Sequence, residues 1–352
     1  MTDPRKILIL RLSAIGDVIR TLPSLHLLRK KFQESWIAWA VEEKAAPILE
    51  GHDALDEIIL VPRKTWVRSL KNPFKWIHAL ADIIKFLRTL KRSSFDTVID
   101  FHSSLKSGII SRCTGAKCRI GYTAPYSREF NFLFNNVRLP LREKRISRIE
   151  RNFTLLKYFH INANECKASI SIAAEEKDYI DDFLRSEEFT NRTKIIMFPG
   201  ASKKQAYKKW GSDNYATLAN MLFKNNVAII LGWGPGEREE CEKISSSVEG
   251  AIFLSPPTTL KHLTELIKRC QLYIGGDTAA MHLSCAVGTP CLVIYGPTDP
   301  VINAPWGKQF HIIYDDTIDC SPCRKRRCKK RDCFQNITPE LVYREARKMM
   351  KS

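Results

Sequence analysis

The chain carries the stretch LYIGGDTAAMH at residues 272–282. Its first three residues form an apolar run typical of a buried parallel strand, and small residues after the paired glycines begin a helix that ends near Gly288. A second apolar run follows at residues 291–295. A strand, a glycine-rich turn and a helix N-terminus together present free backbone N–H groups, which predicts a phosphate site. An ordinary helix capped by Asp277 is the alternative.

A matching turn lies near the N-terminus. Residues 7–10 form another apolar run, RLSAIGDV follows at residues 11–18, and a helical pattern begins there. In a doubly wound sheet, ligands bind at this carboxyl edge of the strands. Asp17 is therefore either a base or a helix cap. Because each half of the chain has one such turn, we expect a site between two domains.

Strand and helix patterns alternate along both halves. Apolar runs predict strands at residues 7–10, 36–41, 58–61, 97–101, 195–198, 227–231, 251–254, 272–274 and 291–295. Apolar stripes predict helices at residues 74–90, 149–159 and 339–350, the last with Thr338 as its cap. A polar stretch at residues 173–178 is the expected linker. The alternation predicts parallel sheets covered by helices on both faces.

Composition limits the class of protein. A chain of 352 residues is too long for one ordinary core and favours two domains. A net charge of +18 indicates an anionic partner, such as nucleic acid, anionic lipid or a phosphorylated sugar. We expect a cytoplasmic protein, because no apolar run is long enough to span a membrane and the N-terminus lacks a signal-peptide pattern.

Four motifs occur together. They are RLSAIGDV at 11–18, PGAS at 199–202 followed by KKW at 208–210, GGDT-x3-H at 275–282, and YGPTDP at 295–300. With these motifs the chain resembles, over nearly its whole length, glycosyltransferase family 9, the ADP-heptose:lipopolysaccharide heptosyltransferases. The resemblance implies a GT-B fold, with two Rossmann-like doubly wound α/β domains facing a central cleft. It implies an acceptor-binding domain at 1–175, a donor-binding domain at 176–337, and a C-terminal helix at 338–352 packed back on the first domain.

The resemblance also implies an activity. This is inverting transfer of heptose from ADP-L-glycero-D-manno-heptose to Kdo or the first heptose of the lipopolysaccharide inner core, with no cofactor required for catalysis. A sugar hydroxyl needs a base in the transition state, and Asp17 matches the family's catalytic aspartate. The implied partners are ADP-heptose, a lipid A–Kdo acceptor and the anionic inner face of the inner membrane, on which the protein would be peripheral. No specific nucleic acid is expected.

The donor-binding residues follow from the same match. Lys208 matches the diphosphate lysine, with Lys209 as the alternative register, and Glu237 matches the ribose carboxylate, with Glu239 as the next choice. The alternative for Glu237 is that its negative charge only stabilises the N-terminus of the following helix. The remaining donor-binding candidates are Ser202, Asp277, Thr278, Ala279 and His282, of which the last is equally consistent with an ordinary helical histidine.

Basic residues suit the carboxylates and phosphates of such an acceptor. Arg128 matches an acceptor-site arginine of the family and ranks first. Each further candidate follows a predicted strand, and for each the alternative is a solvated surface charge; these candidates are Arg63, Lys64, Arg68 and Lys106.

Four cysteines stand apart from this scheme. Cys320, Cys323, Cys328 and Cys333 form C-x2-C-x4-C-x4-C, with seven basic residues among residues 324–331. Four closely spaced thiols are able to bind a structural Zn²⁺ ion, and free thiols or disulfides are the alternatives. The basic cluster raises a competing class, a cysteine-knuckle nucleic-acid-binding protein, although no aromatic residues alternate with the basic ones.

Two further functions are alternatives. A nucleotide-sugar epimerase or dehydrogenase is disfavoured, because no G-x-G-x-x-G follows the first strand. A family member that uses another nucleotide-linked sugar is an open alternative.

Overall fold

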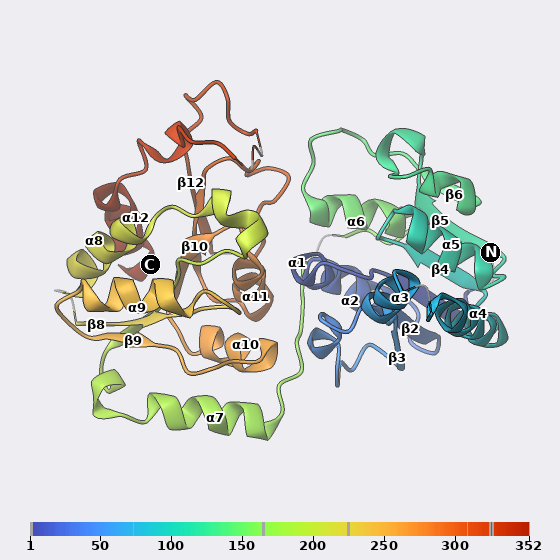
Figure 1. Cartoon of the computed structure of the whole chain (residues 1–352), viewed down its shortest axis with the longest axis horizontal. Helices are drawn as coiled ribbons and strands as arrows, with labels where there is room; N and C mark the ends of the chain where they lie inside the picture. Colours follow the sequence, from blue (N-terminus) through green and yellow to red (C-terminus); the bar gives the residue numbers. More distant parts are fainter. Residues whose placement is uncertain are drawn as a thin grey trace. The chain divides into compact units, whose positions relative to one another are not determined.

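The computed structural model describes residues 3–72, 74–163, 166–223, 226–307, 309–323, 325 and 327–351. The chain divides into two compact units, Met1–Ser171 and Ile172–Ser352 (Figure 1). The division falls a few residues before the boundary expected at residue 175. Most of the expected linker instead forms the start of the first helix of the second unit, α7 (Ala174–Leu184).

The first unit contains one six-stranded sheet in the order β3-β2-β1-β4-β5-β6. Every pair of neighbouring strands in it is parallel. Its strands are β1 (Lys6–Leu10), β2 (Trp36–Val41), β3 (Glu57–Leu60), β4 (Thr97–Asp100), β5 (Cys118–Tyr122) and β6 (Val137–Leu139). Its α-helices are α1 (Ile15–Ile19), α2 (Leu22–Lys31), α3 (Arg63–Leu70), α4 (Trp76–Arg92), α5 (Leu105–Cys113) and α6 (Arg148–Leu156).

The second unit repeats this plan. Its six-stranded sheet has the order β12-β11-β10-β7-β8-β9, again with parallel neighbours throughout. Its strands are β7 (Thr193–Phe198), β8 (Val227–Leu231), β9 (Ile252–Leu254), β10 (Leu272–Gly276), β11 (Cys291–Tyr295) and β12 (Phe310–Tyr314). Besides α7, its α-helices are α8 (Ser212–Phe223), α9 (Arg238–Ser246), α10 (Leu260–Lys268), α11 (Ala279–Val287) and α12 (Pro339–Lys351).

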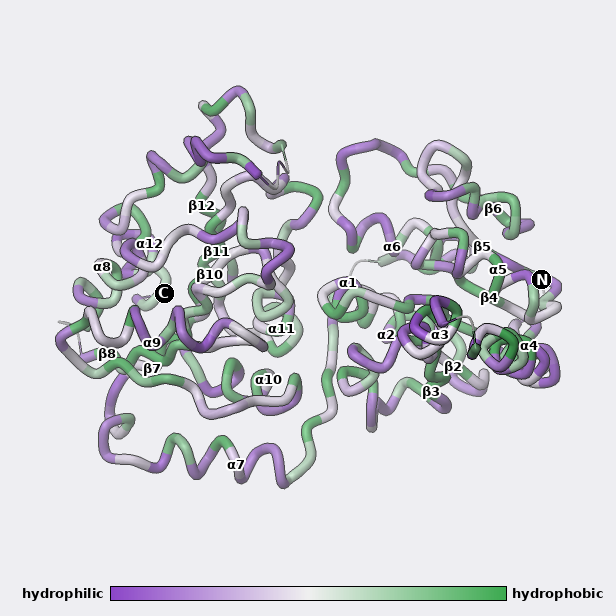
Figure 2. The backbone as a smooth tube through the Cα atoms, in the orientation of Figure 1, coloured by the Kyte–Doolittle hydropathy of each residue, from purple (hydrophilic) through white to green (hydrophobic). Residues whose placement is uncertain are grey.

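Both sheets have the strand order of a doubly wound nucleotide-binding fold. Their central strands are continuous apolar runs because helices cover both faces of the sheet. In β1, for example, residues 7–10 are completely buried, and in β8 all five residues are buried. Figure 2 shows the corresponding hydrophobic segments along β7 and β8. The prediction of two parallel α/β domains is confirmed.

The strand order reverses between β1 and β4 in the first unit and between β7 and β10 in the second. In open α/β sheets, the carboxyl ends of the two strands at such a reversal leave a crevice for a ligand. The motif residues 11–17 follow β1, and residues 277–278 follow β10. The fold therefore brings both motifs to the edge where a ligand is expected.

The C-terminal helix α12 begins where the sequence predicts, with the Thr338 hydroxyl accepting a hydrogen bond from the backbone N–H of Leu341 at 3.3 Å. Its apolar side chains Val342 and Ala346 are completely buried in the core of the second unit, and the helix contacts α8. Its apolar face thus belongs to the core of the second unit, and the expected packing of this helix on the N-terminal domain stays a prediction. The segment before α12 is tied to the second unit, because the Trp210 indole N–H donates to the carbonyl of Ile337 at 2.8 Å.

Candidate functional site

The first cluster of functional side chains surrounds Asp17 on α1. Its carboxylate lies 2.5 Å from the guanidinium of Arg20, 3.4 Å from that of Arg148 and 3.5 Å from that of Arg11. The N-cap of α1 is Ala14, and no side chain caps this helix. Asp17 therefore lies in the first turn of α1 without capping it, and its carboxylate is paired with the three arginines instead.

The three arginines control the protonation of Asp17. Burial alone would raise the pKa of this carboxyl group, but the attraction of Arg11, Arg20 and Arg148 outweighs burial and holds the pKa well below its ordinary value. The carboxylate is consequently ionised at neutral pH and is a weak proton acceptor while all three cations surround it.

Each arginine is positioned by local structure. Arg11 follows β1 and donates through Nη1 to the carbonyl of Phe101 at 2.5 Å. Arg20 lies one helical turn beyond Asp17. Arg148 begins α6, which is fixed at its start by reciprocal hydrogen bonds between Ser147 and Glu150. The same helix is anchored to the chain after α1, because the Asn152 side chain donates to the Arg20 carbonyl at 3.1 Å.

His102 lies two residues after β4 and is subject to the same positive charges. Burial, followed by the charges of Arg11 and Lys106, lowers the pKa of His102 to about 3, against the opposing effect of Asp17. Its imidazole is therefore neutral at physiological pH. Arg128, the first-ranked acceptor candidate, also lowers this pKa, so its charge acts on the Asp17 cluster, and its backbone N–H donates to the Ser103 carbonyl at 3.2 Å.

A second carboxylate at this edge is Glu42, which directly follows β2. Its Oε1 accepts a hydrogen bond from Lys106 Nζ at 2.8 Å and lies 3.7 Å from Arg63 Nη1. The structure thus brings together two of the acceptor candidates through a residue that the sequence analysis did not identify. Lys64 and Arg68 lie exposed on α3.

In the second unit, Lys208 and Asp277 form a charged cluster at the equivalent edge of the sheet. Lys208 Nζ donates to Asp277 Oδ2 at 2.8 Å and to the Asp277 carbonyl at 3.1 Å, and both side chains are largely buried. Lys209 instead pairs with Glu240 on α9. Of the two candidate lysines, it is therefore Lys208 that reaches the glycine-rich turn.

The turn before α11 has the geometry of an anion site. Thr278 is the N-cap of α11 and Ala279 its first residue, and no side chain caps the helix, so the alternative of an Asp277 cap is wrong. The first N–H groups of a helix lack partners within it and lie at its positive end. At Gly275, a Cβ atom would stand 2.4 Å from the Tyr273 hydroxyl oxygen and 3.1 Å from the Phe198 carbonyl oxygen, so a side chain there would be crowded.

His282 lies one turn along α11 and is only 2% exposed. Its Nε2 is 3.9 Å from Asp277 Oδ1, and its ring stacks on Trp306 with the ring centres 5.6 Å apart. The His282 side chain therefore lies near Asp277 in the interior of the second unit and is not exposed to solvent.

Glu237 lies at the end of the loop after β8. It is only 8% exposed, and its Oε2 accepts a hydrogen bond from the Gly234 N–H at 3.0 Å. Burial raises the pKa of Glu237, while the Gly234 hydrogen bond and Lys209 act in the opposite direction. A Cβ atom at Gly200 would stand 2.3 Å from Oε2, so glycine lets the carboxylate approach the end of β7. Glu239, the alternative, is exposed, as is Ser202.

The cysteine cluster does not form the expected zinc site among the described residues, where no group of three or more His, Cys, Asp or Glu side chains is arranged to hold a metal ion. Cys320 and Cys328 are exposed, Cys323 is half-buried and Cys333 is buried. Burial raises the pKa of Cys333 to about 11, with smaller contributions from the other three thiols. Two basic residues of this cluster, Arg324 and Arg326, lie outside the described residues.

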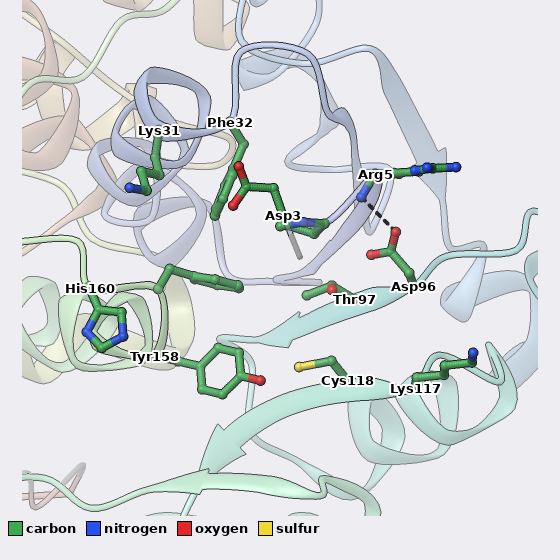
Figure 3. Close-up of a pocket in the computed structure, with 12 residues that line it drawn as sticks. Asp3, Arg5, Lys31, Phe32, Asp96, Thr97, Lys117, Cys118, Tyr158 and His160 are labelled. Carbon is green, nitrogen blue, oxygen red and sulfur yellow. Dashed lines mark hydrogen bonds between the residues drawn. The ribbon is translucent and has the colours of Figure 1, made fainter. Parts of the chain in front are cut away.

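A cavity of about 680 Å³ in the first unit lies away from these clusters. It opens at the amino ends of β1, β4 and β5 and is lined by Arg5, Lys31, Asp96, Cys118 and Tyr158, among others (Figure 3). The Asp96 carboxylate accepts a hydrogen bond from the Arg5 N–H at 2.7 Å. Because ligands of such sheets bind at the carboxyl edge, this cavity is not part of the candidate site.

Comparisons with known proteins identify the family of the chain. The family model described as glycosyltransferase family 9 (heptosyltransferase) matches residues 83–333. The lipopolysaccharide core heptosyltransferase OpsX of Haemophilus influenzae is 25% identical over 318 residues, which cover 88% of this chain and 84% of the relative.

Solved structures share the fold. A glycosyl transferase family 9 protein from Veillonella parvula superposes with a TM-score of 0.83 at 21% identity, covering 98% of this chain and 97% of the other. The E. coli heptosyltransferase WaaC with ADP-2-deoxy-2-fluoro heptose superposes with a TM-score of 0.73 at 21% identity, covering 97% and 99%. The two parallel-sheet domains thus form a GT-B fold.

Proposed function

Because the chain belongs to glycosyltransferase family 9, the heptosyltransferases, we propose that it transfers heptose from ADP-L-glycero-D-manno-heptose to the lipopolysaccharide inner core, with inversion. One observation carries the proposal: each unit presents complementary charged groups at the reversal point of its sheet, a carboxylate among cations in the first and a lysine at a helix N-terminus in the second. The named activity of the OpsX relative and the sugar nucleotide held by WaaC support the sugar and the nucleotide.

In this proposal, Asp17 is the base. The oxygen of the acceptor hydroxyl attacks the anomeric carbon of heptose while the bond from that carbon to the phosphate oxygen of ADP breaks. The hydroxyl proton passes to the Asp17 carboxylate, and ADP leaves with the electron pair. A single displacement of this kind inverts the anomeric centre.

The arginines link acceptor binding to the strength of the base. An acceptor rich in carboxylates and phosphates competes with Asp17 for its guanidinium groups. Arg148, one of the two more distant partners of Asp17, and Arg128 are the proposed groups that turn to the acceptor. As Arg148 turns away from Asp17, the pKa of Asp17 rises toward the value of an effective proton acceptor.

The leaving diphosphate is stabilised in the second unit. We assign this role to Lys208 and to the N–H groups of Thr278 and Ala279 at the start of α11. Asp277 holds Lys208 in place before the donor arrives. Glu237 is assigned to the ribose, because two neighbouring hydroxyls suit one carboxylate, and the exposed Ser202 to a phosphate oxygen.

The acceptor of the proposed reaction is lipid-anchored, so the protein would act at the cytoplasmic face of the inner membrane. Among the helices of the described residues, none is long and apolar enough to cross a bilayer. The net charge of +18 suits a peripheral contact with anionic lipid. The nucleic-acid-binding alternative is not supported, because the family model extends through Cys333 and so includes the basic cysteine cluster in the transferase.

The test of the donor is a screen of nucleotide sugars by thermal stabilisation. We expect ADP and ADP-heptose to raise the melting temperature and UDP or UDP-sugars to raise it much less. The choice of acceptor is then tested by supplying lipid A–Kdo with and without a first heptose attached. Equal stabilisation by ADP and UDP would argue for a different donor.

A further inference from the structure

The helices α3 and α4 carry apolar side chains that the fold does not bury. Six exposed apolar side chains of α3, α4 and the segment between them are here called the apolar stripe; they are Leu70, Phe74, Trp76, Ile77, Leu80 and Ile84. Phe74 is 89% exposed and Ile77 is 62% exposed. Monomeric proteins seldom leave large contiguous apolar patches in water, and such patches usually mark an interaction surface.

The stripe is separate from the face of α4 that packs on the domain. Ile77, Leu80 and Ile84 are spaced at i, i+3 and i+7, which puts them on one side of the helix. A neighbouring side faces inward, where Ala79 and Leu90 are buried. The two helices are also fixed to each other, because Trp66 meets Phe86 edge-to-face with ring centres 5.2 Å apart. The stripe is therefore a second apolar face on an anchored helix pair.

Basic side chains surround this face. Residues 63–92 contain nine lysines and arginines against a single acidic residue, Asp82. Lys85 and Arg88 are exposed on α4, and Arg88 continues the line of the stripe one turn beyond Ile84. Figure 2 shows hydrophobic and hydrophilic segments side by side on α3 and α4. An apolar face with an aromatic residue and flanking lysines and arginines is the pattern of a helix lying in a membrane interface.

We propose that the α3–α4 surface docks on an anionic bilayer, with the apolar stripe in the boundary between headgroups and acyl chains. Lys85 and Arg88 then contact lipid phosphates, and their charge is complementary to that of the surface. A second copy of the chain is a poorer occupant, because two such basic faces would repel each other.

The docking surface is continuous with the proposed acceptor site, and this step rests on the proposed function. Helix α3 begins at Arg63, whose guanidinium lies 3.7 Å from Glu42, the carboxylate that also binds Lys106. Docking would therefore hold these residues beside the membrane surface from which a lipid-anchored acceptor projects. The surface itself needs only anionic lipid.

The test is cosedimentation with vesicles of phosphatidylethanolamine and phosphatidylglycerol, with no acceptor present. Replacing Ile77, Leu80 and Ile84 together by Ser should lower vesicle affinity at least about tenfold, since each buried apolar side chain contributes to partitioning. The double variant Lys85→Glu, Arg88→Glu should lower it similarly at low salt. Matched controls are Phe310→Ser, an exposed apolar residue of the second unit, and the double variant Lys177→Glu, Lys268→Glu, which has the same net charge change.

Insertion has its own spectroscopic signature. Wild-type tryptophan fluorescence should shift to the blue on anionic vesicles and not on phosphatidylcholine vesicles, and Trp76→Phe should remove most of the shift. Circular dichroism and stabilisation by ADP show whether each variant is folded.

Three results would overturn the proposal. They are unchanged vesicle binding by the folded triple-serine variant, equal effects of the control variants, and a wild-type dimer in sedimentation that the triple-serine variant dissolves. A failure of the proposed function would give a different result from a failure of the docking proposal. If the wild-type protein binds vesicles but transfers heptose neither to lipid A–Kdo nor to a deacylated soluble acceptor, docking stands and the assigned activity is wrong.

Discussion

At the scale of single residues, Asp17 is the most constrained side chain of the candidate site. Three guanidinium groups lie within 3.5 Å of one carboxylate. They secure its ionisation and weaken it as a base. The proposed chemistry therefore depends on an anionic acceptor that draws one or more of these cations away.

The low pKa of Asp17 has a consequence for stability. Its folded-state pKa is below the unfolded value, so its ion pairs stabilise the protein above the unfolded pKa, and this stabilisation is lost as the pH falls. We predict that the free energy of unfolding in urea decreases as the pH falls from about 5 to about 2, and that Asp17→Asn reduces this decrease. Asp178→Asn, at an exposed position of α7, is the control. An identical pH dependence in wild type and Asp17→Asn would contradict the assignment.

The two lysines before Trp210 give a matched pair of variants. Lys208→Ala should weaken stabilisation by ADP by up to about 1.5–3 kcal/mol, if its ammonium binds the diphosphate directly. Lys209→Ala breaks the pair with Glu240 and should lower the stability of the free protein while changing ADP binding little. Isothermal titration with ADP and urea unfolding separate the two effects. The reverse result would assign the diphosphate to Lys209.

Single residues also show what the sequence can predict. Asp17, Lys208 and Glu237 could be proposed because each follows a predicted strand and matches a residue of the family, and their roles remain predictions. Arg20 could have been found from its i, i+3 spacing to Asp17. Arg148 lies 131 residues from Asp17 in the sequence, and the contact depends on how α6 packs, so no local pattern predicts it. Glu42 likewise acquires its cations only through folding.

At the scale of secondary structure, long apolar runs were the reliable signal. All nine predicted strands occur, with small shifts at their ends, because buried parallel strands need continuous apolar residues. The missed strands were β5, β6 and β12. β5 contains Arg119 and Gly121, β6 has only three residues, and β12 is an edge strand with an exposed His311. These strands are specified by pairing with a neighbour more than by their own composition.

Helix α12 offers a test at this scale. Val342 is completely buried against the core of the second unit. Val342→Ala should destabilise the protein by about 1–3 kcal/mol, because it leaves a cavity beside α8. Val301→Ala, at a 41% exposed position, is the control and should have little effect. Urea unfolding monitored by circular dichroism measures both, and equal effects would show that α12 is not part of that core.

At the scale of the whole molecule, two sheets with the same strand order divide the work of one reaction. In the proposed function, the first unit supplies the carboxylate and the cations for an anionic acceptor, and the second supplies the groups for a nucleoside diphosphate. The high net charge could be predicted to indicate an anionic partner. The basic residues of α3 and α4 can be counted from the sequence, but the exposure of the apolar side chains beside them required the structure, because apolar spacing along a helix does not show which side chains are buried.

The decisive measurement is a transfer assay with ADP-heptose and lipid A–Kdo, comparing the wild-type protein with Asp17→Asn. Wild type should release ADP and yield an acceptor heavier by one heptose with an inverted anomeric centre. Asp17→Asn should lower kcat by roughly 10²–10⁴ while ADP still binds nearly as tightly. A wild-type protein that binds ADP-heptose but forms no product on any inner-core acceptor would contradict the assigned reaction, and a folded Asp17→Asn variant with near-normal kcat would contradict the assigned base.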